Sequence, residues 1–581
     1  MPQAAPASLT PSPTWRVELT ARQRRGLLLA LVALGPCLFL IGRGPEFPMD
    51  DTYIHFQYAH SLAERGRLEF NPGEFRGLGT TSLLWALLLA GGIKLGIAPE
   101  LGVRVLGIGA LLAATLCVAS LSRPWFGAGD ARRADLGSLL VAALFALSGN
   151  ILWFALSGME TMLFVALGLA ALVCYQRQCW WGIGLAVGAI GITRPEGLAL
   201  APTLGLLELA RLWGGGKTNW RGWVIGAGLA ALPICAWMLY CHANTGNWLP
   251  TTFAGKRVAQ LDAVRHFLAA VPAISLYTKS PQIVWLMLWT SYTFMYVFGV
   301  SAFPGPAVVL SRDLGAEVSV RLSIIGLTLA VLVVLPLLVL GLREVARLAR
   351  RALCERDQDV ALLAACGVWL WACIHNLAYF VLLPIAGTGT RYQAINHLIL
   401  WSLLALGLMA VAPRRRLLWV YGIAVLALVV TDVGSWRTVY GANLAHMSRA
   451  RIAAARYVAE QLPANARVGA YDIGALRYFG ERPIIDLGGL TDTAFVHYQQ
   501  RHQVDQYLKD RGATHLALPA RHSTDHKALF DFAAYLGIDK SPLYDLNELA
   551  VFEVEHDLWQ LGNDPTANYQ PSVRVYEIRW K

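Results

Sequence analysis

Charged residues are scarce in this sequence. Only 15% of its 581 residues are Asp, Glu, Lys or Arg, whereas 56% are hydrophobic and the mean hydropathy is +0.46. A soluble protein of this length would need more charge to cover its surface. The composition therefore excludes a soluble multi-domain protein and predicts a polytopic α-helical membrane protein.

Disulfide frameworks and zinc-binding patterns are also absent. The nine cysteines lie in or beside apolar runs, and none follows Cys373. No small-residue cleavage pattern follows the first apolar run, so residues 1–25 are expected to be a cytoplasmic tail before a retained first span. The formal charge of +11 is interpreted as Arg and Lys that hold cytoplasmic loops in place, and no nucleic-acid partner is expected.

About 11 apolar runs are long enough, or nearly so, to cross ~30 Å of hydrocarbon. They are Gly26–Gly42, Val105–Leu121, Gly137–Leu156, Thr161–Tyr175, Trp180–Ile192, Leu198–Leu212, Trp223–Cys241, Leu322–Leu342, Val360–Leu383, Ala394–Val411 and Leu417–Val433. Leu83–Ile97 and the Trp- and Tyr-rich Ile283–Val300 are ambiguous, and the count rises to about 13 if both cross. The lower count places the arginine clusters on the cytoplasmic side, as the positive-inside rule requires. Residues 26–433 should then form the membrane module, with a first outer loop over residues 43–104.

The composition changes after Val433, where apolar runs shorten and polar residues become more frequent. Short strands are predicted at Arg467–Tyr471, Pro483–Leu487, Thr514–Leu518, Leu549–Val554 and Val573–Ile578. Helices predicted at Ala450–Gln461, Val504–Arg511 and Lys527–Tyr535 alternate with some of them. Residues 434–581 should therefore form a soluble α/β domain, which an odd number of spans places outside the cytoplasm.

Two adjacent carboxylates, Asp50 and Asp51, follow the first apolar run. Burying two like charges is costly and perturbs their pKa values, so such a pair indicates base catalysis or cation binding. The alternative is a helix cap, in which one carboxylate accepts the first backbone N–H groups of an amphipathic helix over Tyr53–Glu64. Capping and catalysis are compatible, and both interpretations stay open.

Other polar motifs fall on the same outer face in the preferred topology. A guanidinium at Arg194 or Arg391 can neutralise a phosphate leaving group by bidentate hydrogen bonding, while a carboxylate such as Asp50 takes a proton from an attacking hydroxyl. Two alternatives remain: Arg194 pairs with Glu196 or Glu160, and Arg391 is an interfacial anchor.

The sequence contains further residues that could contact a substrate. The candidates are His55, Glu160, Glu196 and Tyr392. Among His55, His242, His375 and His397 no two have close ligand spacing, so no metal site is predicted from them. His375 and Asn376, within an apolar run, are interpreted as hydrogen-bond partners between helices.

These motifs resemble the GT-C superfamily of integral membrane glycosyltransferases that use polyprenyl-phosphate sugars. Three segments carry the resemblance after the first span: Asp50–Ile54, Gly66–Glu74 and Gly79–Trp85. Within the superfamily the sequence is similar to the mycobacterial terminal arabinofuranosyltransferase and its bacterial relatives, which share the Ser157–Glu160 and Thr193–Gly197 signatures and an extracytoplasmic C-terminal domain.

The resemblance implies an inverting transfer in which Asp50 is the base. Asp51 would orient the acceptor or help to hold a divalent cation, where relatives use one; no other cofactor is implied. The donor would be a polyprenyl-phosphate sugar, with arabinofuranose as one candidate, and the acceptor a glycan, lipid or protein. The enzyme would lie among the lipids of a bacterial cytoplasmic membrane. Leu83 stands where relatives often have proline, so the loop before the next helix is expected to differ.

Two other functional classes are alternatives to an enzyme. A transporter or flippase would move a lipid-linked sugar without chemistry, but such proteins tend to place ionisable groups near the bilayer midplane and to consist of repeated halves. In a structural or assembly factor, the acidic pair would have no evident function. The pair in an outer loop, and the absence of a usable repeat, favour an enzyme.

Overall fold

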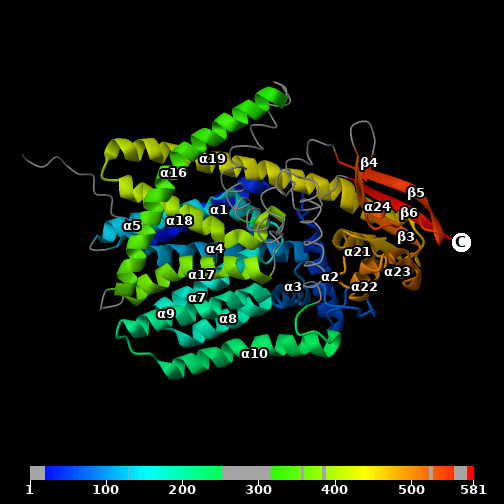
Figure 1. The fold of residues 1–581 in the computed structure, drawn as a ribbon, viewed down its shortest axis with the longest axis horizontal. Helices are drawn as coiled ribbons and strands as arrows, with labels where there is room; N and C mark the ends of the chain where they lie inside the picture. The colour runs from blue at the N-terminus through cyan, green and yellow to red at the C-terminus, as the bar shows by residue number, and fades with distance from the viewer. Residues whose placement is uncertain are drawn as a thin grey trace, which may run out of the picture.

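The computed structural model describes residues 20–127, 130–250, 289, 316–354, 359–382, 388–522, 528–554 and 572–581. The ambiguous run Ile283–Val300 lies outside these residues, except for Trp289. A bundle of helices occupies most of the molecule, and a smaller domain with a β-sheet lies at one end of it (Figure 1).

Six helices in the described residues are long and apolar enough to cross a membrane. They are α1 (Ala21–Leu40), α4 (Pro99–Phe126), α10 (Trp220–Thr245), α17 (Val360–Leu382), α18 (Ala394–Val411) and α19 (Arg415–His446). A seventh span is possible if α5 (Ala131–Ala146) and α6 (Gly149–Leu156) cross together, although a 57° bend separates them. Helices of this number, length and apolar composition are typical of a multi-pass membrane protein.

Three of the expected spans, and the ambiguous run Leu83–Ile97, form short helices. α3 (Leu83–Lys94), α7 (Thr161–Gln176), α8 (Trp180–Thr193) and α9 (Leu200–Trp213) have at most 16 residues, whereas α16 (Ala316–Cys354) is long. A 16-residue helix is about 24 Å long, less than the ~30 Å of a hydrocarbon core. Helix length therefore supports only part of the expected count of about 11 spans.

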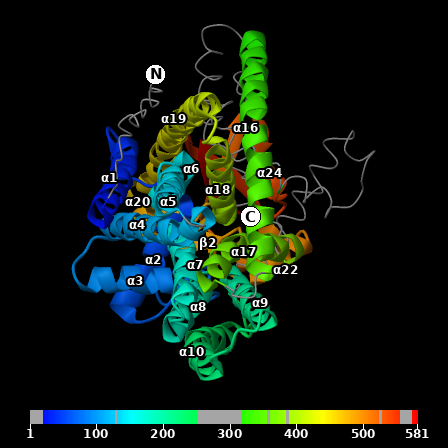
Figure 2. The same cartoon turned by 90° about the vertical axis from the view of Figure 1, so that its left-hand side faces the viewer.

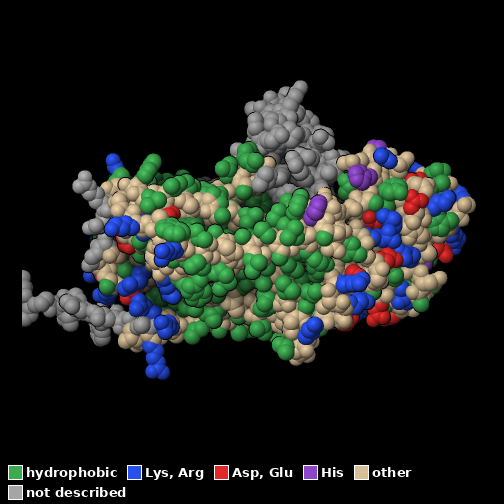
Figure 3. Space-filling model, turned by 90° about the horizontal axis from the view of Figure 1, so that it is seen from below, with side chains coloured by type: hydrophobic (Ala, Val, Ile, Leu, Met, Phe, Trp, Pro, Cys, Tyr) green, Lys and Arg blue, Asp and Glu red, His purple; other side chains and the backbone are tan. Residues whose placement is uncertain are grey.

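Hydrophobic side chains cover a broad part of the bundle on the face seen in Figure 3. This apolar surface lies between one end that carries Lys and Arg and the C-terminal domain, whose surface mixes both signs of charge. Among the exposed apolar residues are Trp213, Leu232 and Val430. Viewed from the end opposite the domain, α1, α10 and α16 lie at the periphery (Figure 2). Such an apolar surface suits contact with lipid.

The C-terminal domain contains a mixed six-stranded sheet. Its strands are β1 (Val468–Ala470), β2 (Ile484–Asp486), β3 (His515–His522), β4 (Ala528–Asp531), β5 (Tyr544–Glu553) and β6 (Ser572–Trp580). The spatial order is β2-β1-β3-β6-β5, with β4 beside β3. β1 is parallel to β2 and β3, and the other pairs are antiparallel.

A strand lies at each of the five predicted places, but the prediction of a helix over Lys527–Tyr535 was wrong for its first half. β4 occupies Ala528–Asp531, and only α24 (Phe532–Tyr535) is helical. Pairing with β3 decided the conformation there, because tertiary contacts override short-range periodicity. The sequence patterns also missed α21 (Gly474–Gly480) and α22 (Ala494–Gln500), two helices of only seven residues. The predicted helix at Val504–Arg511 is present as α23 (Val504–Asp510).

The C-terminal domain packs directly on residues 43–104, the segment expected to be the first outer loop. That loop contains α2 (Asp50–Arg65), whose Tyr53 ring lies 5.2 Å from the ring of Phe479 between centroids. Asn71 exchanges two hydrogen bonds with the backbone of Ile484 in β2, at 2.8 and 3.0 Å. Loop and domain therefore form one body at the end of the bundle.

Candidate active site

Asp50 begins α2 and reaches into the C-terminal domain. Its carboxylate oxygens accept the backbone N–H groups of Gly474 and Ala475 at 2.7 and 2.8 Å, at the start of α21. A Cβ at position 474 would lie 2.1 Å from the Asp50 carbonyl oxygen, so this close approach requires glycine. Asp50 thus caps a helix, but the capped helix is α21, and no side chain caps α2 itself.

Burial and the nearby Asp472 carboxylate raise the pKa of Asp50 to about 7. The two backbone N–H bonds act in the opposite direction but lower the pKa by less. Its side chain is almost fully enclosed, with 8% of the residue exposed.

Asp51 faces a different environment, a hollow of about 370 Å³. The hollow is lined by Asp51, Ile54, His55, Gly79, Thr81, Met159, Glu160, Arg391, Tyr392 and Leu490. These residues come from α2, the loop before α3, the turn before α7, the 3-10 helix η3 (Thr388–Gln393) and the C-terminal domain. Asp50 is not among them. The structure thus brings five of the candidate residues to one hollow, from segments far apart in the sequence.

Arg391 holds Asp51 in place. Its Nη2 donates to Asp51 Oδ2 at 2.6 Å, and its guanidinium carbon lies 5.1 Å from the centre of the Tyr392 ring. Arg391 Nε and the Nδ1 atom of His55 are buried without a hydrogen-bond partner among the described residues. Water or a polar ligand in the hollow would satisfy both atoms.

Arg194 lies behind the hollow. Its Nε is 2.6 Å from Glu196 Oε1, and its Nη1 is 3.7 Å from Glu160 Oε1. Its guanidinium carbon lies 4.2 Å from the centre of the Tyr392 ring. The ion pairs considered from the sequence are therefore present, and Arg194 and Glu196 do not line the hollow. Because Arg194 pairs with Glu196 and Glu160 and lies over the Tyr392 ring, it holds Glu160 and Tyr392 in position.

α17 contributes two residues that sequence reasoning did not assign to the site. Tyr379 donates to Glu196 and accepts from Arg194 Nη2 at 3.4 Å, and His375 Nε2 lies 2.8 Å from the Tyr392 carbonyl oxygen. Their i, i+4 spacing on an otherwise apolar helix was the available signal. The expected link between helices is confirmed for Asn376, which exchanges amide hydrogen bonds with Asn396 of α18.

The Ser-Gly-Met-Glu turn places Glu160 beside His55. Gly158 has a φ of +80°, and a Cβ there would lie 2.3 Å from Thr52 Cγ2. Thr52 Oγ1 donates to the Ser157 carbonyl at 2.7 Å, and Trp85 Nε1 donates to the Gly158 carbonyl at 3.1 Å. These contacts bring Glu160 Oε2 to 3.4 Å from His55 Nε2.

The carboxylate oxygens of the acidic pair have protein partners in the structure. Both Asp50 oxygens accept backbone N–H groups, and Asp51 is paired with Arg391. In the part of the chain that the structure describes, no three His, Cys, Asp or Glu residues gather as metal ligands. Because the carboxylates are committed elsewhere, we assign no step to a metal.

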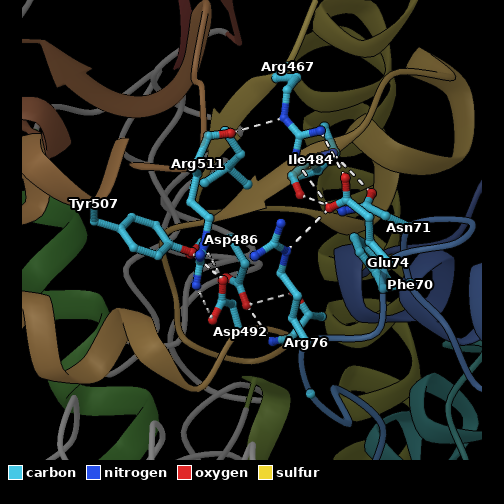
Figure 4. Close-up of a pocket in the computed structure, with 13 residues that line it drawn as sticks. Phe70, Asn71, Glu74, Arg76, Arg467, Ile484, Asp486, Asp492, Tyr507 and Arg511 are labelled. Atoms are coloured by element: carbon cyan, nitrogen blue, oxygen red, sulfur yellow. Dashed lines mark hydrogen bonds and ion pairs between the residues drawn. The ribbon is translucent and has the colours of Figure 1, made fainter. Parts of the chain in front are cut away.

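A second hollow, of about 350 Å³, lies between the first outer loop and the domain (Figure 4). Arg467 is paired with Glu74 at 2.8 Å, and Arg511 with Asp492 at 2.7 Å. Gly77 lines this hollow and Gly79 the first, so the loop between them separates the two. The second hollow is thus part of a polar interface between the domain and the loop beside Asp51.

Comparisons with known proteins agree with this architecture. Residues 440–569 match the model of a domain of unknown function, DUF8728. No curated protein sequence is significantly similar to the chain. The structure is similar to the oligosaccharyltransferase of Archaeoglobus fulgidus, with a TM-score of 0.53 and 11% identity, over 86% of this chain and 69% of that chain. It is also similar to ArnT from Cupriavidus metallidurans bound to undecaprenyl phosphate, with a TM-score of 0.50 and 12% identity, over 95% of this chain and 98% of that chain. At these identities the likeness shows the fold alone, which this chain shares with both proteins over most of its length.

Proposed function

We propose that this protein transfers a sugar from a polyprenyl-phosphate donor to a glycan, lipid or protein acceptor. The observation that carries the proposal is the hollow where Asp51, His55, Glu160 and Arg391 converge from separate segments. The fold supports it, because ArnT of the same fold was crystallised with undecaprenyl phosphate. Arabinofuranose is the candidate sugar that the resemblance suggests.

In the proposed reaction the acceptor hydroxyl attacks the anomeric carbon of the donor. The bond between that carbon and the phosphate oxygen breaks, and prenyl phosphate leaves with the bonding electrons. A carboxylate accepts the hydroxyl proton, and a guanidinium stabilises the charge on the phosphate. The donor carries its own leaving group, so positioning and charge supply most of the catalysis.

We assign the base to Asp51 and donor-phosphate recognition to Arg391. Asp51 lines the hollow, whereas Asp50, the expected base, has both oxygens in hydrogen bonds to α21. Arg391 retains an unpaired Nε and lies within bonding distance of Asp51. His55, Glu160 and Tyr392 would contact the sugar, while Arg194 and Glu196 support them from behind.

We place this site and the C-terminal domain outside the cytoplasm of a bacterial cell, in the cytoplasmic membrane. The support is the distribution of arginine: the bundle end opposite the domain carries Arg343, Arg347, Arg350 and Arg414. Positively charged loops resist translocation.

The proposal is tested with the purified full-length protein and a panel of prenyl-phosphate sugars that includes arabinofuranose. Enzymatic transfer releases prenyl phosphate in an amount equal to the glycosylated acceptor. A flippase would move the intact donor across a vesicle membrane without releasing prenyl phosphate. Translocation of donor in the absence of any release would therefore reject the enzyme and select the transporter.

A further inference from the structure

The bundle end opposite the C-terminal domain contains two adjoining hollows. The larger, of about 1320 Å³, lies between the last part of α16 and the end of α18, and the smaller, of about 640 Å³, shares residues with it. Arg343, Arg347 and Arg350 of α16 and Arg414 after α18 line the larger one. Neither hollow includes any residue of the candidate active site.

A close helix crossing produces this shape. A Cβ at Gly341 of α16 would lie 2.2 Å from the Leu403 carbonyl oxygen, and one at Gly407 of α18 would lie 2.1 Å from the Leu337 carbonyl oxygen. The two helices therefore touch backbone to backbone. Beyond the crossing α18 ends at Val411, while α16 continues to Cys354 as a charged helix. Figure 1 shows α16 running obliquely past α18 at this end.

The hollows carry a large excess of positive charge. Six arginines line them (Arg133, Arg343, Arg347, Arg350, Arg351 and Arg414), with only two carboxylates. Glu344 pairs with Arg347 at 2.7 Å, and Asp130 accepts the backbone N–H of Arg133. Arg343, Arg350 and Arg414 are exposed and have no acidic partner among the described residues.

The same region is apolar on its membrane side. Leu340 and Val411 line the larger hollow beside the arginines. The preceding turns of α16 expose Leu335, Val339 and Leu342, each more than half accessible. The positive-inside rule explains why arginines occur at this end, but it does not explain why they gather around a concave surface at the foot of an apolar face.

We propose that this hollow binds an anionic phospholipid, with the headgroup phosphate among Arg343, Arg350 and Arg414 and the acyl chains along the exposed face of α16. Guanidinium groups hold phosphate through paired, charge-assisted hydrogen bonds, and basic pockets between helices at the membrane surface suit lipid headgroups. The apolar wall selects a lipid over a soluble phosphate, because a soluble phosphate gains nothing from Leu340 and Val411.

The experiment uses native mass spectrometry of the full-length protein, equilibrated with equal amounts of phosphatidylglycerol and phosphatidylcholine. Wild-type protein is expected to retain phosphatidylglycerol preferentially. The triple variant Arg343→Gln, Arg350→Gln, Arg414→Gln should lose that retention at least tenfold. The matched control, Arg22→Gln, Arg25→Gln, Arg132→Gln, removes three exposed arginines outside the hollows and should retain the lipid as wild type does.

A second variant, Ala346→Trp, fills the larger hollow without changing its charge and should also reduce retention, which covers the case in which the triple variant does not fold. Glycerol phosphate, a soluble headgroup analogue, should not compete at equal concentration. Equal loss in the control triple would show diffuse attraction to the whole surface. Unchanged retention in both hollow variants, or full competition by glycerol phosphate, would equally overturn the proposal.

Discussion

Asp50 and Asp51 are adjacent in the sequence but have different neighbours. Because successive residues of a helix are about 100° apart, one carboxylate turns toward α21 and the other toward the hollow. Asp50 is hydrogen bonded by two backbone N–H groups, and Asp51 by Arg391. The pair therefore divides two tasks that its sequence motif alone could not separate: Asp50 attaches the domain, and Asp51 is the base of the proposed reaction.

The division predicts unequal effects of removing each carboxylate. Asp51→Asn should lower kcat by about 10²- to 10⁴-fold, the range for loss of a general base, with donor binding largely kept. Asp50→Asn should chiefly lower thermal stability. The Asn side chain has one acceptor oxygen, whereas the two Asp50 oxygens accept one N–H group each from α21. Single-turnover kinetics and thermal unfolding of both variants make the comparison. A well-folded Asp50→Asn protein with the larger kinetic loss would return the base to Asp50.

Arg391 offers a second test at the residue scale. An anchoring role would tolerate lysine, whereas phosphate recognition needs the planar fork of a guanidinium. Arg391→Lys should therefore weaken donor use by about 1 to 3 kcal/mol, the range for a charge-assisted hydrogen bond, at unchanged protein yield. Kinetics at varied donor concentration provide the measurement. Wild-type values for both Arg391→Lys and Arg391→Ala would mean that another group holds the phosphate.

The raised pKa of Asp50 predicts how the free energy of unfolding depends on pH. Its pKa in the folded protein, about 7, lies above the ordinary value of 3.8, so the native state binds more protons than the unfolded state between these values. Stability should therefore fall as pH rises from about 4 to about 7 through this group. Thermal unfolding of the wild type and of Asp50→Asn across this range isolates the effect. The difference between their midpoints should change with pH in this interval, and a constant difference would contradict the raised pKa.

At the scale of elements, α21 depends on a glycine to approach α2. Gly474→Ala would place a methyl group against the Asp50 carbonyl, and overpacking of this kind typically costs about 1–3 kcal/mol. The variant should lose stability and transfer activity together, because Leu490 of the same domain lines the hollow. Gly434→Ala in α19 is the matched control, as a Cβ there meets nothing within 4 Å. Equal unfolding midpoints for the two variants would show that α21 docks more loosely than described.

How much of the fold the sequence predicts depends on the kind of element. Apolar runs located the bundle helices well, because a helix in lipid must be apolar over most of its length. They did not reveal that Gly137–Leu156 bends between α5 and α6. β4 was not predicted because pairing with β3, rather than its own periodicity, makes it a strand.

The candidate site was predictable in its residues and not in its arrangement. Asp51 and Arg391 were both selected from their loops, but they lie 340 positions apart, and no local pattern brings them to 2.6 Å. Tyr379 was overlooked because an aromatic residue in an apolar helix carries little information without its neighbours. The roles of Asp50 and Asp51 separated only once α21, a helix absent from the prediction, was in place.

At the scale of the whole molecule, the two ends of the bundle have different chemistry. The domain end gathers carboxylates, arginine and histidine around one hollow, and the opposite end gathers arginines around another. A lipid-linked donor suits this arrangement, since its sugar and phosphate would lie at the domain end while its prenyl chain runs along the apolar surface of the bundle.

This polarity predicts the orientation of the chain in the membrane. Arg415 should face the cytoplasm, and the C-terminal domain should lie outside, because positive clusters resist translocation. Ala464 is exposed on the domain, so a cysteine there is accessible to a reagent. In a background without the nine native cysteines, Ala464→Cys should react with an impermeant thiol reagent in intact cells, and Arg415→Cys only after permeabilisation. Labelling of position 415 from outside, with protection of position 464, would invert the topology. It would also move the proposed sugar transfer to the cytoplasmic face.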